Sequence, residues 1–118
     1  MYKVPDDLNS DFLRDDTLIM VSFNANQIYL HFETGILITL EGEYIISIVG
    51  KEHLYNVYPV SYENGLLELI EKKVERTEVL NSKKDLTIHF ENSLCVTLIN
   101  SDNYESYQVK INDRRFIL

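Results

Sequence analysis

Residues 28–40 read IYLHFETGILITL, and residues 86–98 read LTIHFENSLCVTL. In both stretches apolar residues alternate with polar ones on either side of a short turn, Thr34-Gly35 in the first and Asn92-Ser93 in the second. Alternation with a period of two is typical of strands that bury one face, and a turn between two such runs predicts an antiparallel hairpin. We therefore expect a fold that is mostly antiparallel β-sheet.

The two stretches also match each other without gaps, each residue of the first with the residue 58 positions later. The apolar matches follow from alternation alone, but the polar face carries identical residues where the pattern imposes none. These identical polar pairs are His31 with His89, Glu33 with Glu91 and Thr39 with Thr97. Carried backwards, the same spacing pairs Val21 with Val79. The match favours two β meanders descended from one duplicated unit and sharing one core; the alternative is that any two amphipathic hairpins look alike.

The chain has 118 residues, the usual size of one domain. Its pattern predicts four segments: an acidic N-terminal arm over 1–16, a first β meander over 17–50, a connector with a helix over 51–73, and a second β meander over 74–118. Within the connector, Leu66, Leu69 and Ile70 fall on one helical face, with acidic residues early and lysines late. This predicts one short helix at about 62–72, and hence an α+β fold with the helix against a sheet or pair of sheets.

The net charge is −8, from 19 acidic and 11 basic residues. Nucleic acid and anionic membranes need a cationic surface, so the charge argues against both as partners. It fits a well-solvated surface or a basic protein partner. A single cysteine, Cys95, excludes an intramolecular disulfide, and neither a secretory leader nor an apolar run of about 20 residues is present. We expect a cytoplasmic protein with no membrane contact.

Two histidines, His31 and His89, are the candidates for chemistry. If the two halves are related by a pseudo-two-fold axis, the imidazoles approach each other, and Glu33 and Glu91 lie on the same faces to complete a metal site. The alternative is a half-buried, hydrogen-bonded histidine in each strand, and no short ligand spacing such as HxH is present. Cys95 matches Leu37 of the other copy, which indicates packing rather than catalysis. We expect no catalytic set, no metal and no cofactor.

Contact residues for a partner are expected in two places. Tyr55, Tyr58 and Tyr62 lie in the polar connector, where exposed tyrosines make good anchors. Asp15 and Asp16 end the acidic arm. The alternative for the tyrosines is that they cover an open edge or end of the sheet with their rings packed.

The second half carries a resemblance. Leu-x-x-Leu, then Val-x-x-x-x-Val, leads into the hairpin at 86–98, and Tyr104-Glu105-Ser106-Tyr107 precedes a further strand. This resembles small bacterial domains of unknown function grouped as DUF6188-like, which have a comparable hairpin and a Tyr-Glu-Ser-aromatic motif before the last strand. The resemblance covers 66–118 best and implies no catalytic residue. Small acidic proteins of this kind look like immunity proteins of bacterial toxin systems, which is an analogy.

Three functions follow from the sequence as hypotheses. The leading one is a non-enzymatic, acidic protein-binding module, in its concrete form an immunity protein that neutralises a basic bacterial toxin. The second is a structural domain, such as a homodimer joined through a sheet edge. The third is a metal- or ligand-binding enzyme that uses His31 and His89.

Overall fold

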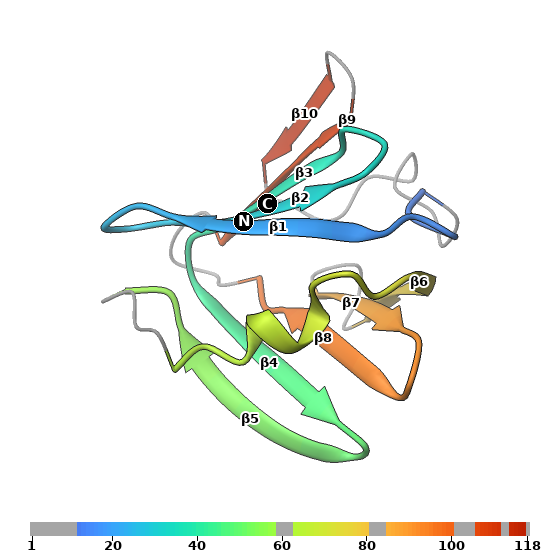
Figure 1. The fold of residues 1–118 in the computed structure, drawn as a ribbon. Helices are drawn as coiled ribbons and strands as arrows, with labels where there is room; N and C mark the ends of the chain where they lie inside the picture. Colours follow the sequence, from blue (N-terminus) through green and yellow to red (C-terminus); the bar gives the residue numbers. More distant parts are fainter. Residues whose placement is uncertain (1–11, 59–62, 81–84, 101–105, 112–113, 118) are drawn as a thin grey trace.

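The computed structural model describes residues 12–58, 63–80, 85–100, 106–111 and 114–117 (Figure 1). Within these residues, strands form two five-stranded sheets in which all neighbours are antiparallel. The first sheet has the order β1 (Leu18–Phe23), β2 (Ile28–Phe32), β3 (Leu37–Leu40), β9 (Tyr107–Ile111) and β10 (Arg114–Ile117). The second has the order β5 (Lys51–Asn56), β4 (Glu43–Ile48), β8 (Leu94–Leu98), β7 (Asp85–Phe90) and β6 (Val74–Leu80).

The two sheets lie against each other around one core (Figure 1). Alternate residues of the central strands are buried, as the sequence pattern predicts: Leu30 on β2 and Ile88 on β7 are both 0% exposed. Burying one such side chain contributes about 1.5–3 kcal/mol. The expected β-rich, antiparallel fold is therefore confirmed. In the part of the chain that the structure describes, no helix has the length and apolar character needed to cross a membrane.

The helix predicted at about 62–72 is wrong in length and type. Among the described residues of this segment only Leu66–Leu69 are helical, as one 3-10 turn, η1. Gly65 precedes the turn at φ 71°, and a Cβ there would lie 3.1 Å from Ile46 Cγ1, so this left-handed position suits glycine. Glu71 follows it with φ 71°. A single turn already buries Leu66 and Leu69, which are 0% exposed, so the apolar spacing needs no longer helix, and the described residues do not confirm the α+β description.

The connector predicted from residue 51 begins instead with a strand. Lys51–Asn56 forms β5, which pairs with β4 through the turn at Val49 and Gly50. Both turn residues have positive φ, 50° and 81°, as a tight two-residue hairpin requires. The alternation pattern does not identify this strand because KEHLYN is mostly polar. The strand lies at a sheet edge, where five of its six side chains are exposed.

Each sheet takes strands from both halves of the chain. The hairpin β4–β5 leaves the first half and joins β8, with Tyr44 opposite Leu98. The strands β9 and β10 leave the second half and join β3, with Tyr107 opposite Leu40. The two predicted meanders are therefore not separate units, because each half contributes to both sheets.

The registers of the two halves agree. Ile28 pairs with Leu40 in the first sheet, and Leu86 pairs with Leu98 in the second, which keeps the spacing of 58 residues. In the preceding strands the spacing is 56, since Val21 pairs with Leu30 and Thr77 pairs with Ile88. The match of Val21 with Val79 is therefore wrong. The cause is that six residues separate the paired Val79 and Leu86 of β6 and β7, whereas four separate the equivalent pair Phe23 and Ile28 of β1 and β2.

The two halves meet at a seam formed by residues 15–18 and 71–74. Thr17 and Lys73 form an antiparallel bridge there. The N–H of Leu18 donates to the carbonyl of Lys72 at 3.2 Å, and the N–H of Val74 donates to the carbonyl of Asp16 at 2.7 Å. These bonds are reciprocal, so each half satisfies backbone groups of the other.

Candidate functional site

The two histidines lie in different sheets, each on an outer face. His31 Nε2 is 2.8 Å from Ser22 Oγ, and His89 Nε2 is 3.0 Å from Glu78 Oε1. The neighbours of both histidines in β2 and β7 point into the core, so the rings point away from each other. Within the described residues no three His, Cys, Asp or Glu side chains are grouped as a metal site would require.

His89 belongs to a partly exposed hydrogen-bonded cluster with Glu78 and Arg76. The pKa of Glu78 is lowered, chiefly by its hydrogen bond with His89, and Arg76 Nη1 lies 3.4 Å from the same carboxylate oxygen. Cys95 stands opposite His89 across β7 and β8. Burial raises the pKa of its thiol, which makes the reactive thiolate scarcer and suits the packing role predicted for Cys95.

The five predicted contact residues fall into different environments. Tyr58 is 67% exposed and Asp15 is exposed, so both are open to a partner. Tyr55 is half-buried and stacks on Tyr44 with ring centroids 5.4 Å apart. Asp16 is 5% exposed, and its carboxylate accepts hydrogen bonds from the N–H of Thr17 at 2.9 Å and from the N–H and hydroxyl of Thr34. Tyr62 lies outside the described residues.

An apolar strand edge is a feature that the sequence-based search missed. Among the described strands β1 forms one edge of the first sheet, and its sequence LIMVSF contains no charged residue. Ile19, Met20 and Phe23 on this strand are 50%, 48% and 41% exposed. Large exposed apolar side chains gathered on one element mark interaction surfaces. We call Ile19, Met20 and Phe23 the β1 anchors.

The corresponding strand of the second sheet differs from β1 in charge. β6 occupies the same place in its sheet and has the same bulge on β7 that β1 has on β2. By register, Glu75 and Arg76 of β6 stand where β1 has Ile19 and Met20. β6 thus carries charged residues at the two positions where β1 carries apolar ones.

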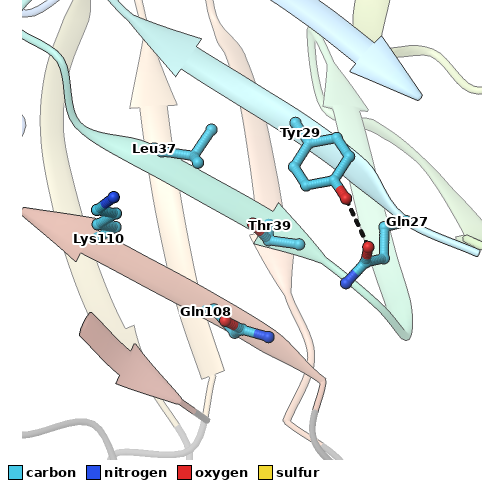
Figure 2. A pocket seen from close by; sticks show the side chains of 6 residues that line it. All are labelled: Gln27, Tyr29, Leu37, Thr39, Gln108 and Lys110. Atoms are coloured by element: carbon cyan, nitrogen blue, oxygen red, sulfur yellow. Dashed lines mark hydrogen bonds between the residues drawn. The ribbon is translucent and has the colours of Figure 1, made fainter. Parts of the chain in front are cut away.

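A hollow of about 220 Å³ lies on the outer face of the first sheet, over β2, β3 and β9 (Figure 2). It is lined by Gln27, Tyr29, Leu37, Thr39, Gln108 and Lys110. Sequence reasoning missed it because its two sides come from segments about seventy residues apart, and only the pairing of β3 with β9 joins them. The β1 anchors, by contrast, could have been found from the charge-free run LIMVSF.

Comparison with known proteins yields no relative to guide these assignments. No family model matches the chain, and no curated protein or solved structure matches it.

Proposed function

We propose that this chain is a non-enzymatic, acidic protein-binding module that takes up a basic protein partner at the edge strand β1. The observation that carries the proposal is the set of β1 anchors on a charge-free edge. A strand at the edge of a sheet presents unpaired backbone groups, and a partner strand can add to it by main-chain hydrogen bonds.

Natural sheets discourage such addition by placing charges on their edges. The other edge strands follow this rule: β5 begins with Lys51 and Glu52, β6 contains Glu75 and Arg76, and β10 begins with two arginines in sequence. β1 departs from the rule at positions where β6 obeys it. The difference supports a binding role for β1.

The β1 anchors supply the apolar part of the affinity. Each is about half exposed, so covering it stabilises a complex by about 1 kcal/mol, roughly half of the value for full burial. Leu67 on η1, which packs beside β1, is 59% exposed and extends the apolar surface. Three or four such anchors suit a compact interface in which a few residues carry most of the binding energy.

The net charge of −8 favours a partner that is basic. This charge attracts a basic protein over a distance and so raises the association rate of the complex. Because salt screens the attraction, the association rate falls as the ionic strength increases. The concrete form of the proposal is an immunity-type protein of the cytoplasm that occludes a basic toxin, such as a nuclease. Its resemblance to DUF6188-like domains supports this form by analogy.

We also infer that the two halves descend from one duplicated unit. The support is the matched register of the hairpins β2–β3 and β7–β8, the matched bulges and the reciprocal seam. On this account β1 and β6 began alike and then diverged in the charges on their edges.

Affinity capture from the native host at low salt tests the function. The test variant Ile19→Glu/Met20→Arg gives β1 the residues of β6 without changing the net charge. The control variant Val49→Arg/Leu54→Glu places the same charges on β4–β5, at residues that are 73% and 59% exposed. We expect the wild type and the control to capture a basic protein and the test variant to lose it. Equal capture by all three, or no basic protein on the wild type, contradicts the proposal.

A second copy of the chain is the competing occupant of β1, because two such strands can also pair with each other. Light scattering at high concentration separates the two cases. A monomer agrees with a heterologous partner, whereas a dimer that the test variant abolishes and the control keeps assigns β1 to self-association.

A further inference from the structure

The hollow on the first sheet combines two rows of outward-facing side chains. Tyr29, Thr39 and Gln108 are neighbours across β2, β3 and β9, and Leu37 lies opposite Lys110 in the adjacent row. Figure 2 shows the Tyr29 ring and the Lys110 side chain on opposite sides of Leu37 and Thr39. The floor is therefore part apolar and part polar, with a cation at one side.

One wall of the hollow is held in place by a carboxylate. Glu41 Oε1 accepts from Gln108 Nε2 at 2.8 Å, and Glu41 Oε2 accepts from Gln27 Nε2 at 3.2 Å. The Tyr29 hydroxyl donates to Gln27 Oε1. Both carboxylate oxygens of Glu41 thus accept hydrogen bonds from amides. The Gln27 amide is held at its nitrogen by Glu41 and at its oxygen by the Tyr29 hydroxyl. The wall is organised before any ligand arrives, which reduces the cost of binding.

Two other polar groups of the hollow have no partner among the described residues. Lys110 is exposed and makes no ion pair with any described residue, and the hydroxyl of Thr39, a residue only 7% exposed, has no hydrogen-bond partner among them. No acidic side chain stands on the outward rows of β2, β3 and β9, although the whole chain carries −8. The carboxylate beside the hollow, Glu41, is already hydrogen-bonded by the Gln27 and Gln108 amides, and Lys110 pairs with no described carboxylate, so this cation suits an anionic ligand.

The second sheet gives an internal comparison. At the places that match Tyr29 and Thr39, the hydroxyls of Thr87 and Thr97 bond to each other at 2.8 Å. Register places Ile45 where the first sheet has Gln108, and Ser47 where it has Lys110. The equivalent positions of the second sheet therefore carry neither a cation like Lys110 nor an amide like Gln108. Since the second sheet forms without them, these side chains are not needed to form such a sheet.

We propose that the hollow binds the carboxylate of a small organic acid with a planar or apolar body. The Lys110 ammonium pairs with the carboxylate, the Thr39 hydroxyl donates a hydrogen bond to it, and the body of the acid lies on Leu37 and the Tyr29 ring. At about 220 Å³ the hollow is smaller than the pockets of roughly 300–1,000 Å³ that enclose drug-sized molecules, so the body is about the size of one ring. This site is separate from the β1 anchors and does not depend on the proposed function.

A two-dimensional NMR titration with benzoate tests the proposal, with benzamide as the neutral probe of the same shape. We expect benzoate to shift the amide signals of residues 27–39 and 108–110. Benzamide cannot pair with the Lys110 ammonium and should bind about tenfold more weakly, which corresponds to about 1.4 kcal/mol. Lys110→Met should weaken benzoate binding by a similar factor, and Thr39→Val should weaken it less.

Lys51→Met is the matched control, because it removes the same charge from an exposed residue of β5. Its benzoate affinity should equal that of the wild type. Equal binding of benzamide, an unchanged affinity in Lys110→Met, or the absence of shifts at these residues overturns the proposal. The NMR spectrum of each variant shows whether it is folded, so loss of the fold is not mistaken for loss of binding.

Discussion

Asp15 and Glu71 occupy equivalent positions on the two sides of the seam. The N–H of Asp15 donates to the carbonyl of Val74 at 2.9 Å, and the N–H of Glu71 donates to the carbonyl of Leu18 at 2.7 Å. Both residues have left-handed backbone conformations, with φ of 66° and 71°. A seam built from reciprocal bonds holds the edge strands β1 and β6 in place and so determines where the β1 edge lies.

The left-handed conformations give the first prediction. Glycine adopts positive φ without the steric cost that a side chain brings, so Asp15→Gly and Glu71→Gly should each raise the free energy of unfolding by about 0.5–1 kcal/mol. Urea denaturation measures both variants. A gain at one position and a loss at the other would show that the two sides of the seam are not equivalent.

The second prediction concerns the leucines beneath the seam. Leu13 and Leu69 are both 0% exposed, and their carbonyls accept from the N–H of Asp16 at 3.0 Å and of Lys72 at 3.1 Å. Leu13→Ala and Leu69→Ala should each lower the free energy of unfolding by about 2–5 kcal/mol, because each leaves a cavity. Leu67→Ala, at a residue 59% exposed, is the control and should change it by less than about 0.5 kcal/mol.

The third prediction separates Asp16 from its neighbour. Removing the buried Asp16 carboxylate leaves the N–H groups of Thr17 and Thr34 without their acceptor, so Asp16→Ala should cost about 1–3 kcal/mol of stability. Asp15→Asn removes the same charge from an exposed side chain, keeps a residue that tolerates positive φ, and should be nearly neutral. Thermal unfolding compares them, and equal losses would contradict a structural role for Asp16.

The fourth prediction is a loss of stability at alkaline pH. Burial raises the pKa of Tyr44 and Tyr107 well above the ordinary value of about 10. The unfolded chain therefore loses these protons first, so the stability they contribute is complete below about pH 10 and falls as the pH rises above it. Phenolate absorbance should show that Tyr44 and Tyr107 ionise only as the chain unfolds.

A matched variant assigns this signal. Tyr44→Phe should reduce the late-ionising group to one tyrosine and cost about 1 kcal/mol, because the Tyr44 hydroxyl donates to the buried Asn64 carbonyl at 3.0 Å. If all the tyrosines of the folded protein ionised together, the burial argument would fail.

The local elements of this fold could be predicted from sequence, and its connections could not. Alternation identifies the hairpins at 28–40 and 86–98 because one face of each strand is buried. The joining of β3 with β9 brings together residues about seventy positions apart, and no local pattern specifies which strand edges pair. The helix prediction failed because one 3-10 turn satisfies the spacing of Leu66 and Leu69 as well as a longer helix does.

The candidate sites divide in the same way. The charge-free run of β1 is visible in the sequence, although its exposure depends on β1 being an edge strand. Asp15 and Asp16 look alike in sequence, but only Asp16 is drawn inward by the groups around Thr34. His31 and His89 do occupy equivalent positions in the hairpins β2–β3 and β7–β8. Because both positions face outward and the hairpins lie in different sheets, the two rings lie on opposite outer faces.

Hydrogen exchange on the captured complex tests the central claim most directly. If a basic partner adds to the edge of the first sheet, those amides of residues 19–23 that point away from β2 should exchange more slowly in the complex than in the free protein, while those of β6 should be unchanged. Protection that falls on other strands and leaves these amides as fast as in the free protein would contradict binding through β1.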